Sequence, residues 1–172
     1  MSEPGEAQRR FCEAAWLRLV GAVSHYCGDR HVAEELVQEA LIRACERWRH
    51  VSGLSAPEGW VYRVAVNLAV SRWRRVRAER RARERYGAEL SGEEIVAVED
   101  QLAVREALRG LSRQQHEAVI LRYVLELSVE EAAQVLETTP GAVRALTHRA
   151  TIRLRQRLAV DEPIEQEVTD GT

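Results

Sequence analysis

The residues of this chain with the clearest chemical potential are arginines, which gather in two stretches of the 172-residue sequence. Residues 72–85 hold eight arginines and two glutamates, and residues 140–158 hold five arginines and no acidic residue. Acidic runs over 89–106 and 161–172 bring the formal net charge to −2. Two basic surfaces separated by acidic segments predict two contacts with a polyanion. Solvated helix faces are the alternative interpretation of either stretch alone.

The second basic stretch has the layout of a helix-turn-helix. Ser128 and Glu131 are placed to form a capping box for a short helix that ends near Leu136. After a three-residue turn, Thr139 as N-cap and Pro140 at the first helical position open the basic helix. In such a unit the second helix enters the major groove, with its first residues at the base edges.

This basic helix supplies the candidate DNA contacts. Arg144, His148 and Arg149 lie on neighbouring faces, and an arginine that bonds both acceptors of guanine discriminates by about 1–3 kcal/mol. The helix N-terminus offers unpaired amides and a positive dipole end to phosphate. The residues expected at the DNA backbone are Thr139, Gly141, Arg153 and Arg155. An ordinary amphipathic hairpin with a basic surface is the competing interpretation.

Helical periodicity dominates the remaining sequence, which predicts an all-α protein of two small helical domains. Gly28 and Asp29 are expected to end one helix and cap the next, and further capping boxes are expected at 55–58 and 112–115. Residues 49–54 are expected to form a loop. The expected helices cover residues 8–27, 29–48, 55–85, 102–108, 112–124, 128–136 and 139–158.

Other chemistries find little support in the sequence. The three cysteines have no CxxC spacing and are interpreted as buried free thiols, and the five histidines show no metal spacing. No catalytic triad, phosphate loop or carboxylate pair indicates an enzyme. No stretch approaches the roughly 18 apolar residues of a membrane span, and the polar start is no signal peptide, so a cytoplasmic protein without membrane insertion is expected. Core packing rather than base stacking is expected for Trp48, Trp60 and Trp73.

Together these segments resemble the extracytoplasmic-function group of the sigma-70 family. Residues 32–44 (VAEELVQEALIRA) look like region 2.2 of that family, and residues 60–69 (WVYRVAVNLA) match its WLYRIARNLA pattern of regions 2.3 and 2.4. Residues 111–157 look like region 4. The resemblance implies a region 2 domain over 8–85, a flexible acidic linker over 86–100, a region 4 helix-turn-helix domain over 101–158 and an acidic disordered tail over 159–172.

The resemblance also implies roles for individual residues. In the family the region 2.2 helix docks on the polymerase clamp, the following helix and the loop before it bind the −10 element, and region 4 reads the −35 element. The residues implied for core polymerase docking are Glu34, Glu35, Gln38 and Glu39. Those implied for the −10 element are Arg49, Ser52, Asn67, Arg74 and Arg75. Those implied for the −35 bases are Arg144, Ala145, His148 and Arg149.

The function implied is that of a sigma factor that binds core RNA polymerase and promoter DNA, with no cofactor and no metal. Members of the group are commonly held inactive by an anti-sigma factor, a partner that the sequence leaves open. The family usually has glycine where this chain has Glu137, which is expected to strain the turn of the helix-turn-helix. A stand-alone helix-turn-helix regulator and a non-transcribing decoy of the same fold are the alternatives.

Overall fold

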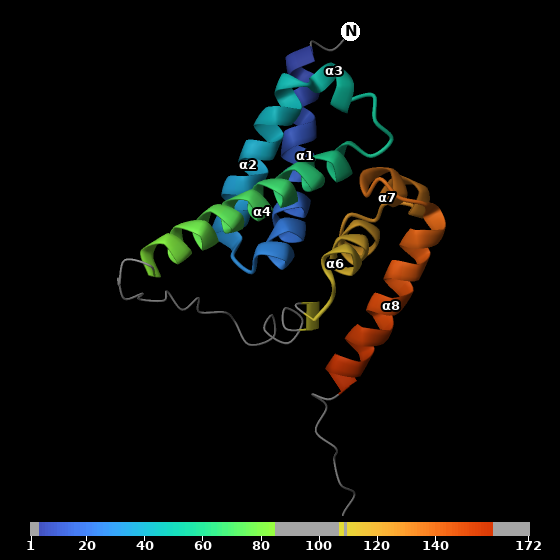
Figure 1. Ribbon diagram of the computed structural model, residues 1–172. Helices are drawn as coiled ribbons and strands as arrows, with labels where there is room; N and C mark the ends of the chain where they lie inside the picture. The colour runs from blue at the N-terminus through green and yellow to red at the C-terminus, as the bar shows by residue number, and fades with distance from the viewer. Residues whose placement is uncertain (1–3, 85–106, 109, 160–172) are drawn as a thin grey trace, which may run out of the picture.

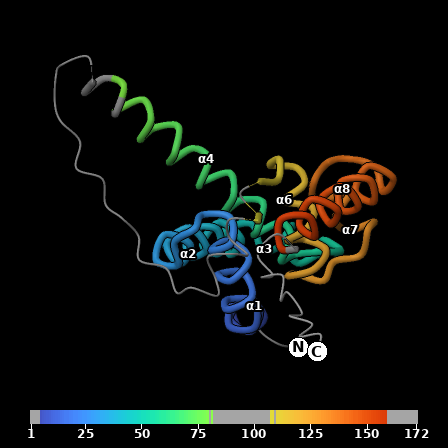
Figure 2. Tube along the Cα trace, turned by 90° about the horizontal axis from the view of Figure 1, so that it is seen from below, coloured from blue at the N-terminus to red at the C-terminus, as the bar shows by residue number. Residues whose placement is uncertain are grey.

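The computed structural model describes residues 4–84, 107–108 and 110–159, and the regular elements within them are all helical. The N-terminal lobe contains α1 (Pro4–Cys27), α2 (Arg30–Glu46), the one-turn helix α3 (Trp48–Val51) and the long helix α4 (Pro57–Glu84). α4 lies across α1 and α2 (Figure 1), and its C-terminal half projects beyond them (Figure 2). The predicted linker over 86–100 and the predicted tail from residue 160 onward lie outside the described residues.

The C-terminal lobe contains α6 (Arg113–Val119), a π-helical turn η1 (Ile120–Val124), α7 (Val129–Val135) and α8 (Pro140–Ala159). Both capping boxes predicted here form. The hydroxyl oxygens of Ser112 and Ser128 each accept a hydrogen bond from the backbone amide three residues later, and the amide of each serine donates to the side chain of that same later residue. The helix expected over 112–124 is divided, since its last five residues wind as the π-helical turn.

One apolar core runs through both lobes. Buried side chains at helical spacing on α1, α2 and α4, such as Leu19, Val37 and Val61, join Leu121 and Leu125 of the C-terminal lobe in a single cluster. Full burial of each Leu or Val stabilises the fold by about 1.5–3 kcal/mol. A second, smaller cluster holds α6 against α8 and contains Leu108, Leu111, Val119 and Ala150, with Leu154 packed on it.

Most of the predicted helix ends are confirmed. Asp29 Oδ1 accepts a hydrogen bond from the Val32 amide at 3.1 Å, which starts α2, and Gly28 ends α1 with a φ of 76°. The capping box expected at Ser55 is wrong, because α4 begins at Pro57 and the Ser55 hydroxyl donates to Gln134 instead. The expected loop after residue 48 begins with the single helical turn α3.

The predictions of buried aromatic and sulfur side chains hold only in part. Trp73 is 44% exposed, since it lies on the projecting half of α4, and its ring stacks on that of Tyr26 at 5.5 Å between ring centroids. Trp48 and Trp60 are half-buried. The three cysteines are free, as expected, but each is half-buried rather than buried, and the sulfur atoms of Cys12 and Cys45 lie 3.7 Å apart.

Candidate nucleic-acid interface

α7, the turn after it and α8 form the predicted helix-turn-helix. Thr139 caps α8, because its Oγ1 accepts a hydrogen bond from the Ala142 amide at 3.2 Å. Val143 and Ala150 are fully buried and anchor α8 against the lobe. Thr139 and Gly141 are exposed, so the first turn of α8 is open to a phosphate group.

Two of the predicted base-reading residues share one exposed face of α8. Arg144 and His148 line a hollow together with Arg155, which was expected at the DNA backbone, and with Arg122 and Tyr123 of η1. Arg144 contacts Glu130 of α7 at 3.4 Å, but both side chains are more than 60% exposed. An ion pair this exposed contributes about 1 kcal/mol or less, so guanine can compete for the arginine.

Arg149 and Arg153 point away from that face. Arg149 lines a separate hollow between α8 and the N-terminal lobe, together with Arg63 and Arg113. Arg153 donates to Gln115 Oε1 of α6 at 3.3 Å. Ala145 is half-buried. The structure therefore brings Arg144, His148 and Arg155 together and sets Arg149 and Arg153 apart from them.

The residues expected at the −10 element lie at α3 and along α4. Arg49 and Ser52 are exposed at and after α3, and Arg74 and Arg75 are exposed on the projecting half of α4. The eight residue-to-residue steps from Asn67 to Arg75 correspond to about 12 Å of helix axis. That length suits a few nucleotides of an extended strand.

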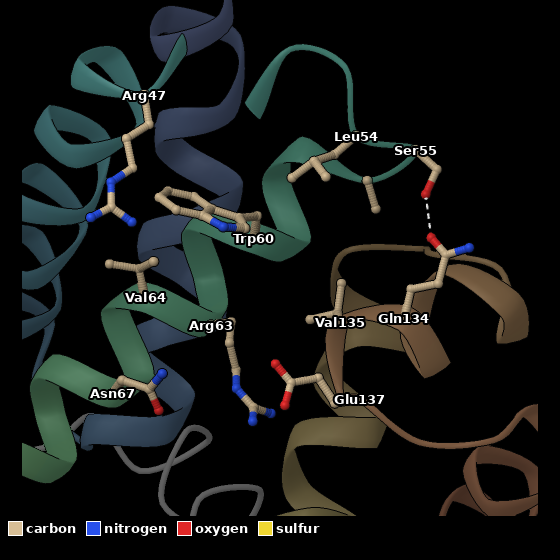
Figure 3. Close-up of a pocket in the computed structure, with 11 residues that line it drawn as sticks. Arg47, Leu54, Ser55, Trp60, Arg63, Val64, Asn67, Gln134, Val135 and Glu137 are labelled. Atoms are coloured by element: carbon tan, nitrogen blue, oxygen red, sulfur yellow. Dashed lines mark hydrogen bonds between the residues drawn. The ribbon is translucent and has the colours of Figure 1, made fainter. Parts of the chain in front are cut away.

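A cavity lies where these residues meet the C-terminal lobe. It is lined by Trp60, Arg63, Asn67 and the loop before α4 on one side, and by Gln134, Val135 and Glu137 on the other. Figure 3 shows Arg63 of α4 and Glu137, after α7, directed toward one another across it. Asn67 also accepts a hydrogen bond from Arg113 of α6 at 3.4 Å. Asn67, a −10 candidate at the lobe boundary, thus already has a hydrogen-bond partner within the chain.

The acidic face of α2 is exposed but internally paired. Glu34 contacts Arg30 at 3.0 Å, Glu39 contacts Arg43 at 2.9 Å, and Glu35 contacts Arg72 of α4 at 2.6 Å. The hydrogen bond from Arg72 and its positive charge lower the pKa of the Glu35 carboxyl below its ordinary value. Gln38 is exposed between them. A basic partner that docks here would replace the arginines of these solvent-screened ion pairs with its own basic side chains.

The structure also shows contacts of residues that the sequence patterns did not single out. Glu117 of α6 is 3% exposed and accepts from Arg113 at 2.6 Å, and it lies 3.5 Å from Arg63 of α4. Arg18 of α1 donates to the carbonyl oxygen of Leu125 at 2.8 Å. Arg63 was visible in the resemblance only as part of a family pattern, and nothing in the local sequence points to a role for Arg18.

The residues that the structure describes hold no group of three histidine, cysteine or acidic side chains placed to bind a metal ion. None of their helices is both long enough and apolar enough to cross a membrane.

Comparison with known proteins places both lobes in one family. The family model for sigma-70 region 2 matches residues 14–79, and the model for sigma-70 region 4 matches residues 101–154. The chain therefore belongs to the sigma-70 family. Within it, the chain is a sigma factor of the extracytoplasmic-function group, a regulator of promoter-directed transcription.

Individual relatives agree with that placement. The chain is 29% identical to the RNA polymerase sigma-E factor of Streptomyces coelicolor, over 73% of this chain and 71% of that protein. It is 26% identical to the ECF RNA polymerase sigma factor SigW of Bacillus subtilis, over 76% and 78%. The fold resembles that of the sigma factor RpoE of Bartonella quintana, solved with the anti-sigma factor NepR, with a TM-score of 0.71 at 24% identity over 89% of this chain and 97% of that one.

Proposed function

We propose that this sigma factor docks on core RNA polymerase through the acidic face of α2 and places α4 and α8 on two promoter elements. The polymerase supplies the nucleotidyl chemistry, and the chain supplies sequence choice. Its site of action is then the cytoplasm, where polymerase and promoter meet. The observation that carries the proposal is the presence, in one small fold, of two exposed basic helices and one exposed acidic helix.

At the −35 element, α8 would enter the major groove. Arg144 and His148 would face base edges while the capped first turn and Arg155 meet phosphates. Arg149 is a base-reading candidate by family position, but in the described structure it lines the hollow against the N-terminal lobe. For Arg149 to contact DNA, the N-terminal lobe would have to move away from this side of α8.

At the −10 element, the loop before α4, Asn67 and the projecting arginines would hold a single strand. Extrusion of a base from the duplex costs a few kcal/mol. Arg74 and Arg75 offset part of this by neutralising phosphates on the opened strand. We further propose that the chain performs no reaction itself, so its whole contribution to initiation is binding energy.

Two variants with matched controls separate docking from DNA reading. Glu35→Arg should weaken core binding because it reverses a charge on the docking face. The control Arg72→Ala breaks the same internal ion pair but keeps the acid, so core affinity should stay within about twofold of wild type. Binding is measured by fluorescence anisotropy of labelled sigma factor titrated with purified core polymerase.

Arg149→Ala should lower transcription from a promoter that needs its −35 element by about tenfold, which corresponds to the loss of about 1.4 kcal/mol. Its core affinity should not change. Arg9→Ala, which changes another exposed arginine, on α1, is the control and should behave as wild type. Normal transcription by Arg149→Ala would remove Arg149 from the recognition surface. Tight binding of promoter duplex by the free chain would instead favour a stand-alone regulator, and core binding without transcription would favour a decoy.

A further inference from the structure

Two of the three cysteines meet where α1 packs on the end of α2. Cys12 lies in the third turn of α1 and Cys45 in the last turn of α2, and their sulfur atoms are 3.7 Å apart. Gln8 of α1 also donates to the carbonyl oxygen of Cys45 at 3.2 Å, which holds the two helices together at this point. The distance between the sulfur atoms is only about 1.7 Å longer than a disulfide bond. A small movement at the end of α2 would therefore be enough to join them.

The third cysteine is out of reach of this pair. Cys27 is the last residue of α1, fifteen residues after Cys12, which corresponds to about 22 Å of helix axis. The α-carbons of a disulfide lie no more than about 7 Å apart. Cys27 therefore cannot pair with Cys12 or Cys45 in the folded chain, and it serves as an internal control for both.

Cys45 is open to small molecules through a hollow at the end of α2. The hollow has a volume of about 500 Å³ and is formed by Gln8 and by the chain from residue 45 to residue 50. Its charged and titratable lining is two arginines and a histidine against one glutamate: Arg47, Arg49, His50 and Glu46. Cysteines that react with oxidants are partly exposed and lie in such positive surroundings. The hollow thus admits a small polar oxidant and favours the negative charge that develops as its O–O bond breaks.

Cys12 is placed for the second step of an oxidation rather than the first. Burial, followed by the hydrogen bond with Cys45, raises the pKa of the Cys12 thiol to about 11. Because the thiolate is the nucleophile, Cys12 reacts slowly with a free oxidant at neutral pH. Its sulfur is nevertheless in contact with that of Cys45, so it can attack an oxidised Cys45 without diffusion.

We propose that Cys12 and Cys45 form an oxidation-sensitive pair, which hydrogen peroxide converts into an intramolecular disulfide. The Cys45 sulfur attacks one peroxide oxygen, the O–O bond breaks, and the leaving hydroxide takes the Cys45 thiol proton to form water. Cys45 is then a sulfenic acid. The Cys12 sulfur attacks the sulfur of Cys45, the S–O bond breaks, and the departing hydroxide takes the Cys12 proton to form a second water. The two thiols lose two electrons to the peroxide, and a dithiol reductant reverses the bond.

The bond would form next to residues that the proposed function assigns to the −10 element. Arg47, two residues after Cys45, both ends α2 and precedes α3. α3 is also held on α1 beside Cys12, since the rings of Phe11 and Trp48 have centroids 5.4 Å apart. A disulfide here restricts the junction that positions α3 and the −10 candidates on and after it.

The disulfide is therefore expected to report oxidant at the −10 surface. In the cytoplasm, where thiols are kept reduced, such a bond forms only while oxidant persists. Transcription from a −10-dependent promoter should fall by about threefold when the pair is oxidised, which is a modest coupling between two neighbouring sites. This effect rests on the proposed function, whereas formation of the bond does not.

Peptide mapping of the full-length protein tests the bond directly. Cleavage by trypsin after arginine places each cysteine in a peptide of its own, residues 11–18, 19–30 and 44–47. Reduced protein freed of reductant is treated with hydrogen peroxide, and the remaining thiols are alkylated with N-ethylmaleimide in urea before digestion. Mass spectrometry should find peptides 11–18 and 44–47 joined and peptide 19–30 alkylated. Dithiothreitol before alkylation should restore all three alkylated peptides.

Alanine variants separate the pair from other effects of peroxide. Cys12→Ala and Cys45→Ala should lose the bond, and Cys27→Ala is the matched control that should keep it. Peroxide should raise the Tm of wild type and of Cys27→Ala by about 5–10 °C, because the bond joins residues 33 positions apart, and should leave the other two variants unchanged. If an alanine variant does not fold, the peptide map of wild type decides the question.

Run-off transcription measures the effect of the bond on the −10 surface. Each chain is oxidised alone and freed of peroxide before core polymerase is added, so that the polymerase is never exposed to the oxidant. The template carries a start site mapped with reduced wild-type holoenzyme. Oxidised wild type and Cys27→Ala should lose about two thirds of their transcript and recover it with dithiothreitol, whereas Cys45→Ala should lose none.

The outcomes distinguish the disulfide from the proposed function. Absence of a bond, a bond that involves peptide 19–30, or bonds between two chains only would overturn the oxidation-sensitive pair. A mapped bond with unchanged transcription would overturn its effect on the −10 surface. The proposed function fails instead if reduced wild-type holoenzyme selects no start sites, and the peptide map then still decides whether the bond forms.

Discussion

Replacing Glu137 with glycine is expected to stabilise the helix-turn-helix. Glu137 has a φ of 53°, in the left-handed region that glycine adopts freely. Its amide donates to the carbonyl of Gln134 at 3.2 Å, and the Thr138 amide donates to that of Ala133 at 2.9 Å. These two bonds define a Schellman turn at the end of α7, in which the residue at this position is usually glycine.

The size of the effect follows from two opposing terms. A side chain in the left-handed region costs about 1–2 kcal/mol relative to glycine. Glycine also has more conformational freedom in the unfolded chain, which lowers the free energy of unfolding by about 0.4–1 kcal/mol. The net gain in the free energy of unfolding should be about 0.5–1 kcal/mol, which corresponds to about 1–4 °C in Tm for a chain of this size.

Thermal and urea unfolding followed by circular dichroism measure this gain. Glu137→Ala is the control, because it removes the same carboxylate but keeps a Cβ atom in the left-handed backbone. It should show no gain. An equal gain from alanine and glycine would refute the reasoning, since charge removal rather than relief of backbone strain would then explain both.

Three further outcomes are expected. Ser128→Ala should lower the free energy of unfolding by about 1 kcal/mol in urea, since it removes one side of the α7 capping box. Burial, with a smaller effect of nearby His25, lowers the pKa of His116 to about 4. The free energy of unfolding should therefore keep its full value above pH 6.5 and fall by about 2 kcal/mol as the pH drops to 4.5, because the unfolded chain then binds a proton that the folded chain does not. His116→Phe should reduce this fall. Burial raises the pKa of the Cys27 thiol to about 12, so iodoacetamide at pH 8 should alkylate native Cys27 at least about a hundredfold more slowly than the urea-unfolded chain.

Local features of the fold were predictable because their causes are local. Asp29, Ser112 and Ser128 start helices where their side chains reach amides three residues on, and such bonds depend only on neighbouring sequence. Ser55 shows the limit of this reasoning. It has the residue types of a capping box around it, yet its hydroxyl bonds Gln134, 79 residues away, because tertiary packing offered a partner that the local pattern did not include.

The candidate site was predictable by type and less so by arrangement. The arginines of α8 are on the predicted helix, but its periodicity alone did not show that Arg149 faces the other lobe while Arg144 faces solvent. The orientation of Arg149 depends on how the lobes pack, and the contacts that set this packing, such as Arg18 with Leu125, join residues 107 positions apart. The internal pairing of Glu35 with Arg72 was missed for the same reason.

The most direct test of the central claim is run-off transcription with purified core polymerase and this chain on a library of genomic fragments, with start sites read by sequencing. The account predicts a narrow set of start sites that share two upstream elements at fixed spacing, and loss of that set for core polymerase alone. Start sites no more selective than those of core polymerase alone would contradict it.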